Sequence, residues 1–227
     1  MSHLIIGGSS GIGRALVDQL LAAGHDVIVL ARERRDLPAT VTFHAYDATT
    51  DELDKNWLPD ALDGLAYCPG SIDLRSFRSL KADAFRAAFE LNVVGAVRSI
   101  QAAERALKKG DDPAIVLFST VAVRRGMPFH AAVAAAKGGV EGLTRSLAAE
   151  YAPTIRVNAI APSLTDTPLA EKLLSSDDKR RAGADRHPLK KIGTPAEIAA
   201  MATFLLGPSS TFMTGQIIGM DGGLGAL

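Results

Sequence analysis

Near the start of the chain, residues 4–14 have the sequence Leu-Ile-Ile-Gly-Gly-Ser-Ser-Gly-Ile-Gly-Arg. The apolar run Leu4–Ile6 predicts a short buried strand, and the glycines after it predict a tight loop. From Ile12 to Ala23 the apolar residues recur with a helical period, and Gly24 is a natural helix end. A strand, a glycine-rich loop and a helix in this order are typical of a βαβ unit that binds a dinucleotide.

The rest of the chain continues the same alternation. Apolar, β-rich runs predict further strands at 27–30, 41–46, 65–68, 115–118, 155–161 and 216–220. Helical patterns separate most of them, at 82–109, 130–150 and 195–206. Continuous apolar strands alternating with helices indicate a parallel sheet that is covered on both faces. We therefore expect an α/β fold, a doubly wound Rossmann-type sheet of about seven strands in a single NAD(P)-binding domain spanning 1–227.

The composition excludes several classes of protein. The 227 residues include 25 basic and 25 acidic side chains, so no net charge attracts the chain to nucleic acid or anionic membranes. One cysteine excludes a disulfide framework, and the five histidines have no metal-ligand spacing, so we expect no metal. No apolar run approaches the ~18–20 residues of a membrane span, and the first strand begins too early for a signal peptide. We expect a soluble, cytoplasmic protein without nucleic-acid or membrane partners.

The glycine-rich loop predicts a binding site for the pyrophosphate of a dinucleotide. Glycines in the loop allow a sharp turn and a close approach of the backbone, and the ligand's charge lies at the N-terminus of the next helix. A nucleoside-triphosphate loop is excluded because Gly13 is followed by Arg14 and Ala15 and not by a Lys-Ser/Thr pair. The residues expected to bind the cofactor here are Gly7, Ser9, Ser10, Gly11, Ile12 and Gly13.

The end of the second strand indicates which dinucleotide is bound. An NAD site usually has a carboxylate there that accepts a hydrogen bond from the ribose 2′-hydroxyl. This strand ends instead in Leu30-Ala31-Arg32. Arg14 and Arg32 would converge on a 2′-phosphate, each charge-assisted contact contributing ~1.5–3 kcal/mol. We therefore expect NADPH (or NADP) in preference to NAD, the alternative being two ordinary surface arginines.

Motifs along the whole chain resemble those of the short-chain dehydrogenase/reductase family. Besides the glycine loop they are Asp47, Asn92-Val93-Val94-Gly95, Phe118-Ser119-Thr120, Lys137-Gly138-Gly139-Val140, Arg156 to Pro162, Ile192 to Pro195, Thr214-Gly215-Gln216 and Asp221-Gly222-Gly223. The resemblance implies a homotetramer or homodimer that transfers hydride between NAD(P)H and a small carbonyl or alcohol.

The resemblance also implies roles for individual residues. Asp47 and Ala48 would border the adenine, Pro69 and Gly70 would line the cofactor, and Pro162 and Thr167 would lie near the nicotinamide carboxamide. Asn92 and Lys137 match the family's catalytic asparagine and lysine, and the lysine also holds the nicotinamide ribose. Thr120 stands at the position of the family's serine and keeps a hydroxyl group.

One departure from the family concerns the chemistry itself. The family has a tyrosine four residues before the lysine, where it is the general acid and base, and this chain has Val133 there. Valine neither donates nor accepts a proton, and loss of a positioned acid typically removes ~10²–10⁴ of rate. Other departures are Ile6 for the first-loop threonine, and Tyr67-Cys68-Pro69-Gly70 for Asn-Asn-Ala-Gly.

Three hypotheses follow. In the first, hydride transfer persists and His130, seven residues before Lys137, supplies the proton; this spacing is similar to the Tyr-x6-Lys of the family's enoyl-reductase branch. Tyr67 is a second candidate acid. In the second, hydride adds to an activated alkene, Thr120 polarises the substrate oxygen, and solvent supplies the proton later. In the third, the protein is a non-catalytic NADP(H)-binding pseudoenzyme that acts as a regulator or partner subunit.

Substrate contacts are expected from two segments, Ser163 to Arg186 and Val123 to Phe129. The charged part of the first, Ser175 to Arg186, predicts either a solvated surface helix or a mobile lid. The pair Arg124-Arg125 indicates an anionic substrate or an acyl carrier, unless it is an ordinary surface pair. The identity of the substrate does not follow from these patterns.

Overall fold

The computed structural model describes residues 1–227 and has seven strands in one parallel sheet. The strands are β1 (Ser2–Ile6), β2 (Asp26–Ala31), β3 (Thr42–Ala45), β4 (Gly64–Tyr67), β5 (Ala114–Phe118), β6 (Arg156–Pro162) and β7 (Ile217–Met220). Their order across the sheet is β3-β2-β1-β4-β5-β6-β7, and every neighbouring pair is parallel. The chain thus winds outward from β1 in one direction and then from β4 in the other. The predicted doubly wound α/β fold is confirmed.

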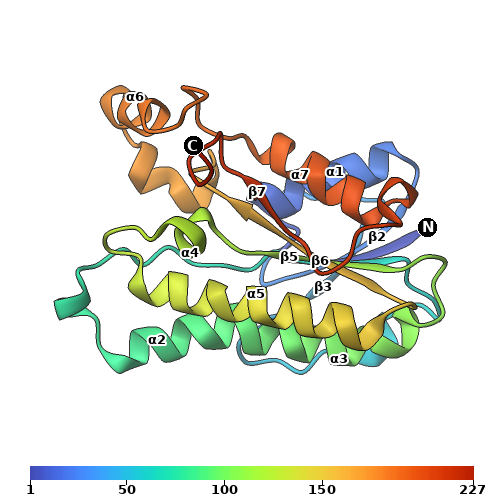
Figure 1. Cartoon of the computed structure of the whole chain (residues 1–227). Helices are drawn as coiled ribbons and strands as arrows, with labels where there is room; N and C mark the ends of the chain where they lie inside the picture. Colours follow the sequence, from blue (N-terminus) through green and yellow to red (C-terminus); the bar gives the residue numbers. More distant parts are fainter.

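Helices cover both faces of this sheet, as Figure 1 shows. One face carries α1 (Gly11–Ala22) and α7 (Pro195–Leu206), and the other carries α2 (Ala82–Phe89), α3 (Gly95–Leu107) and α5 (Ala131–Tyr151). The alternation of side chains along each strand supplies a core to both layers. In β1, Leu4 and Ile6 lie in the core beneath α3 and α5, whereas Ile5 lies in the core beneath α1 and α7.

The helical region predicted over 82–109 contains one wider turn. α2 ends at Phe89, a π-helical turn spans Glu90–Val94, and α3 begins at Gly95. A Cβ at Gly95 would overlap the hydroxyl of Tyr67, so the helix can approach the sheet this closely only with glycine. The π turn contains Asn92, one of the residues predicted at the site. Such turns occur frequently at functional sites.

Shorter elements follow the carboxyl ends of the strands. α4 (Val121–Arg125) comes directly after β5, and the segment after β6 forms a 3-10 helix (Pro168–Leu174) and then α6 (Asp177–Asp185). α4 and α6 lie at the same end of the molecule, at the left of Figure 1. Ligands of doubly wound sheets bind outside the carboxyl ends of the strands. A ligand of this protein is therefore expected at this end.

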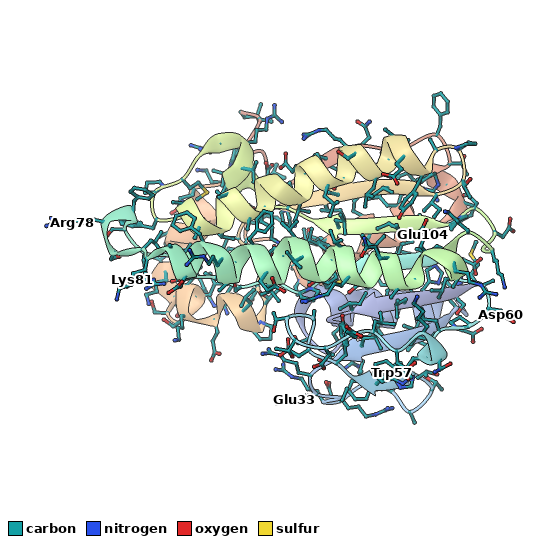
Figure 2. The ribbon with its side chains drawn as sticks, turned by 90° about the horizontal axis from the view of Figure 1, so that it is seen from below. Glu33, Trp57, Asp60, Arg78, Lys81 and Glu104 are labelled. Atoms are coloured by element: carbon teal, nitrogen blue, oxygen red, sulfur yellow. The ribbon has the colours of Figure 1, made fainter.

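The remaining elements are three short 3-10 helices at Lys55–Trp57, Phe77–Ser79 and Pro208–Ser210. The first covers the edge strand β3, because the Trp57 ring stacks on His44 with ring centroids 4.6 Å apart. In Figure 2, Trp57 lies beside the sheet edge, and Arg78 and Lys81 project at the end where α4 and α6 also lie. No helix combines the length and the apolarity needed to cross a lipid bilayer.

Candidate functional site

The glycine loop between β1 and α1 has a backbone that requires glycine. Gly7 and Gly11 have φ angles of 77° and 55°, in the left-handed region that other residues rarely adopt. A Cβ at Gly13 would overlap the carbonyl oxygen of Gly7, so α1 could not begin this close to β1 with any other residue. Ser9, Ser10 and Ile12 belong to the same loop and first turn. The result is a shallow cradle at a helix N-terminus, which suits a pyrophosphate.

The two arginines predicted to converge on a 2′-phosphate lie in different surroundings. Arg14 is already paired, since its Nε lies 3.1 Å from Asp18 and its Nη1 lies 2.9 Å from Asp36. Arg32 is exposed directly after β2 and makes no hydrogen bond or ion pair. Only Arg32 is therefore free to meet an anion, and Arg14 would have to leave Asp36 to join it.

Asp47 and Ala48, which were expected to border the adenine, follow β3 in a turn that holds itself in place. Oδ1 of Asp47 accepts hydrogen bonds from the amide and the hydroxyl of Thr49, at 2.9 and 2.6 Å. These bonds hold the pKa of the Asp47 carboxyl below its usual value, and the charge of Arg32 adds to the effect. The carbonyl of Ala48 accepts a hydrogen bond from Arg98 at 2.8 Å. This corner of the site is pre-formed.

A cavity of about 410 Å³ opens at the carboxyl ends of β4, β5 and β6. The predicted residues in its lining are Ile12, Gly70, Thr120, His130, Lys137, Pro162 and Thr167, together with Val133. Pro69 lies between the cavity and the glycine loop, because a Cβ at Gly7 would be 3.1 Å from its ring. Thr167 lies against Gly11 in the same way, at 3.4 Å. The structure thus brings the cradle and the cavity side by side.

Lys137 lies in the cavity wall as a buried, unpaired cation. Lys137 is only 9% exposed, and its Nζ has no carboxylate or hydrogen-bond partner. Burial lowers its pKa from 10.5 to about 8, and Cys68 opposes this effect slightly. Buried charges are normally paired. An unpaired buried ammonium therefore fits a site that a polar ligand completes.

Asn92 lies beside Lys137 just outside the cavity lining. Asn92 is 1% exposed, and its Nδ2 donates to the carbonyl of Ala88 at 2.8 Å. Its Oδ1 is buried and has no hydrogen-bond partner. Because buried polar atoms are nearly always satisfied, this oxygen calls for a ligand or a water molecule. Asn92 and Lys137 therefore offer an unpaired acceptor and an unpaired donor that a bound cofactor could satisfy.

No tyrosine lines the cavity. Val133, one helical turn before Lys137 on α5, forms part of the wall instead. Tyr67 lies in the core beneath α3 and α5, where its hydroxyl donates to the carbonyl of Leu91 at 2.6 Å and burial raises its pKa. The prediction that Tyr67 supplies a proton is therefore wrong, because the alternation along β4 turns its side chain away from the site. Tyr46 and Tyr151 lie in the same core.

Two other predicted residues retain free polar atoms. Thr120 caps α4 by accepting a hydrogen bond from the amide of Ala122 at 3.3 Å, so its own hydroxyl proton can be donated into the cavity. His130 precedes the first turn of α5, with Nδ1 2.7 Å from the carbonyl of Pro128 and Nε2 without a partner. Both side chains line the cavity.

Two further polar residues meet in the cavity wall, and the sequence did not single them out as a pair. Ser163 follows β6 directly, and its Oγ lies 2.7 Å from Nε2 of His187, which follows α6. The one signal for Ser163 was its place after a parallel strand, at the ligand-binding edge. Nothing in the spacing of 24 residues predicts the contact with His187.

The charged segment after β6 is both a surface helix and a wall of the site. α6 is mostly exposed, yet its residues Lys179 and Gly183 line the cavity, as does Arg186 directly after it. A neighbouring cavity of about 340 Å³ is lined by Arg125 and Arg186 among others. Arg125 also donates to the carbonyl of Leu224, whereas Arg124 is exposed outside both cavities. The predicted substrate segments thus border the site from two sides.

Comparisons with known proteins match the chain over nearly its whole length. The family model described as Enoyl-(Acyl carrier protein) reductase matches residues 7–225. A tropinone reductase homolog of Arabidopsis thaliana is 30% identical over 242 residues, which cover 99% of this chain and 92% of that protein. The 3-oxoacyl-acyl-carrier-protein reductase MabA of Mycobacterium tuberculosis is 30% identical over 236 residues, with the same coverage of both.

Solved structures give a similar result. A short chain dehydrogenase family protein from Francisella tularensis has a TM-score of 0.91 and 28% identity, covering 100% of this chain and 99% of that one. The aldohexose dehydrogenase of Thermoplasma acidophilum has a TM-score of 0.89 and 28% identity, covering 98% and 93%. Both the sheet and the connections that form the cavity are therefore within the matched region.

Proposed function

Since this chain belongs to the short-chain dehydrogenase/reductase family and is an oxidoreductase of that type, we propose that it transfers hydride between NADP(H) and a small carbonyl compound or activated alkene. The observation that carries the proposal is the buried, unpaired ammonium of Lys137 in a cavity beside the glycine cradle. The nicotinamide of the bound cofactor would supply the hydride. The side chains of the cavity would bind the cofactor and stabilise the charge that develops on the substrate.

The cofactor site combines the predicted residues in two groups. The cradle of Gly7, Gly11 and Gly13 leaves room for the pyrophosphate. Lys137 and Asn92 offer a donor and an acceptor that have no partner within the chain, and a ribose with its hydroxyl groups would satisfy both. Binding of the cofactor would thereby remove the cost of leaving these polar atoms unpaired.

The preference for NADP over NAD rests on Arg32. It is an unpaired guanidinium at the end of β2, where an NAD site usually has a carboxylate. A planar guanidinium suits a phosphate because it can donate two parallel hydrogen bonds. The solved protein ElxO, with a TM-score of 0.89 and 25% identity to this chain, has NADP bound, and this likeness supports the same choice here.

At the substrate, two groups would stabilise the oxygen that becomes negative when hydride adds to the neighbouring carbon. Thr120 can donate its hydroxyl proton, and the Lys137 ammonium adds positive charge to a cavity that has no acidic side chain in its lining. Donors aimed at developing charge act most strongly where water is excluded. We also propose that the chain forms the homodimer or homotetramer implied by the family resemblance. Light scattering would measure this oligomeric state in solution.

The test is a fluorescence titration with NADPH and NADH, followed by single-turnover consumption of NADPH with a panel of ketones, quinones and enones. We expect tighter binding of NADPH and its oxidation by at least one member of the panel. Failure to bind either cofactor would refute the proposal. Tight binding without turnover would favour the non-catalytic NADP(H)-binding role.

A further inference from the structure

The Ser163–His187 pair is organised as a hydroxyl group that is hydrogen-bonded to a histidine. Nδ1 of His187 lies 2.8 Å from the carbonyl oxygen of Gly183, which can only accept a hydrogen bond. Nδ1 therefore carries a hydrogen, and in the neutral ring Nε2 is an acceptor. Ser163, with its Oγ 2.7 Å away, must then donate its proton to Nε2. The second lone pair of the Ser163 oxygen remains available to the cavity.

The ring of His187 is held from several directions. The residue is 2% exposed, and its amide donates to the carbonyl of Ala184 at the end of α6. Gly222 of the C-terminal turn packs against it, since a Cβ there would lie 3.3 Å from the His187 ring. The amide of Leu189 donates to the carbonyl of Gly222 at 3.1 Å. In Figure 1 the C-terminus accordingly lies close to α6. A ring fixed in this way keeps one orientation toward Ser163.

Few other groups in the cavity can move a proton. Its lining contains no tyrosine and no Asp or Glu, and burial raises the pKa of the Cys68 thiol to about 12. Lys137 is already assigned to the cofactor and the substrate charge. His130 lies at the start of α5 and is partly exposed, so its ring is less tightly held than that of His187. Ser119 also lines the cavity, but its hydroxyl donates to the buried carboxylate of Glu141 at 2.8 Å. Ser163–His187 is the pair in the lining that joins a hydroxyl group to a histidine, with His187 buried and Ser163 half-buried.

We propose that Ser163 is the residue that exchanges a proton with the substrate oxygen, and that His187 holds and replenishes that proton. The inference rests on the proposed function, because it needs the hydride supplied by NADPH. The pair would take the role that the family gives to a tyrosine, but from the segments after β6 and α6 and not from α5. Ser163 is then a catalytic residue, and His187 is a positioning and proton-storing residue that acts through it.

In reduction of a carbonyl compound, the carbon would receive a hydride and the oxygen a proton. Hydride adds to the carbonyl carbon, and the π electron pair of the C=O bond moves onto the oxygen. Before this step Nε2 of His187 would take a proton from solvent through the cavity, so that Nε2 then donates to Oγ of Ser163 and the Ser163 hydroxyl is free to donate to the substrate. The substrate oxygen would take the proton of the Ser163 hydroxyl, whose O–H bond breaks, while Oγ takes the proton from Nε2. The products would be the alcohol and neutral His187, with the hydride supplied by the reduced nicotinamide of the bound cofactor. Oxidation of an alcohol follows the same path in reverse.

The experiment compares wild type with Ser163→Ala, Ser163→Thr and His187→Gln, using NADPH and the substrate that the panel identifies. Kd for NADPH, kcat, KM and the thermal unfolding midpoint are measured for each variant. Ser209→Ala, an exposed serine in a distant 3-10 helix, is the matched control. We expect Ser163→Ala and His187→Gln to lower kcat by about 100-fold or more, with Kd for NADPH and KM changed by less than about threefold.

Ser163→Thr keeps the hydroxyl and should retain most of kcat. His187→Gln can keep the hydrogen bond to Ser163 but cannot move a proton, which separates proton storage from a structural role. If His187→Gln unfolds, the comparison of kcat between Ser163→Ala and Ser163→Thr still tests the role of Ser163, because alanine fits the space of serine. The inference is overturned, and the proposed function is not, if Ser163→Ala keeps the wild-type kcat. The same holds if a 100-fold loss of kcat appears in a His130→Gln variant and in neither Ser163→Ala nor His187→Gln. A wild type without any turnover overturns the proposed function and the inference together.

Discussion

Oδ1 of Asn92 and Nζ of Lys137 flank Gly70: each lies 3.8 Å from the position that a Cβ on Gly70 would occupy. The oxygen is buried without a partner, and the ammonium is buried without a counter-ion. The two residues come from different helices and are 45 positions apart in the chain. Such an arrangement lowers the stability of the free protein. It strengthens the binding of a ligand that satisfies both groups.

Replacing Lys137 by Met should therefore stabilise the cofactor-free protein at pH 7. Burial lowers the pKa of Lys137 from 10.5 to about 8, which corresponds to a destabilisation of up to about 3 kcal/mol below pH 8 at ~1.4 kcal/mol per pKa unit. Between pH 8 and 10.5 the unfolded chain binds more protons than the folded one, so the free energy of unfolding rises with pH in wild type. This rise should be absent in the variant.

Urea unfolding of wild type and Lys137→Met at pH 7 and pH 10 measures the difference, with the exposed Lys190→Met as control. The same variant should bind NADPH more weakly. A variant that is less stable than wild type at pH 7 would show that Lys137 has a stabilising partner in the free protein.

Replacing Arg32 by Ala should change the choice of cofactor. Arg32 is unpaired at the end of β2, so loss of its contact with a 2′-phosphate should weaken NADPH binding by about tenfold or more while leaving NADH unaffected. Arg14→Ala is the comparison, because Arg14 is held by Asp18 and Asp36 and should matter less. Titration of each variant with both cofactors gives the ratio of affinities. An equal loss for NADPH and NADH would place Arg32 elsewhere than at the 2′-phosphate.

Val133→Tyr should introduce a proton donor one helical turn before Lys137. Val133 lines the cavity but is 9% exposed, so the longer side chain must push past its neighbours to bring its hydroxyl toward the buried ammonium, which favours the ionised phenol. We expect faster ketone reduction, by about tenfold or more, at a cost of ~1–3 kcal/mol in stability from crowding. Single-turnover rates in wild type and variant measure the gain. Val133→Phe, which lacks the hydroxyl, should show the crowding without the gain.

Thr194→Ala should lower stability without affecting the site. Thr194 Oγ1 accepts from the amide of Glu197 at 3.2 Å, and Oε2 of Glu197 accepts from the amide of Thr194 at 2.9 Å, which is a capping box at the start of α7. Loss of such a cap costs ~1 kcal/mol. Thermal unfolding should detect this, and NADPH affinity should stay the same. A change in affinity would mean that α7 contributes to the cofactor site.

Most of the fold was predictable because its signals are local. Each predicted strand appears within a few residues of its expected limits, since a run of buried apolar residues specifies a central parallel strand. The cradle was predictable for the same reason, because the positive φ angles of Gly7 and Gly11 and the close approach at Gly13 are demands on single residues. The π turn at Glu90–Val94 was not, because its apolar pattern continues the helices on either side.

The sequence alone was sufficient for the doubly wound sheet, the glycine cradle and the presence of Thr120, His130 and Lys137 at one edge. The sheet follows from periodicity, and the cradle follows from a glycine-rich loop between a strand and a helix. Thr120, His130 and Lys137 follow from the resemblance to the family. Only the folded chain reveals that Arg14 is held by Asp36, that Tyr67 faces the core, and that Ser163 meets His187. Each of these depends on side-chain directions and on the path of long connections, which no local pattern encodes.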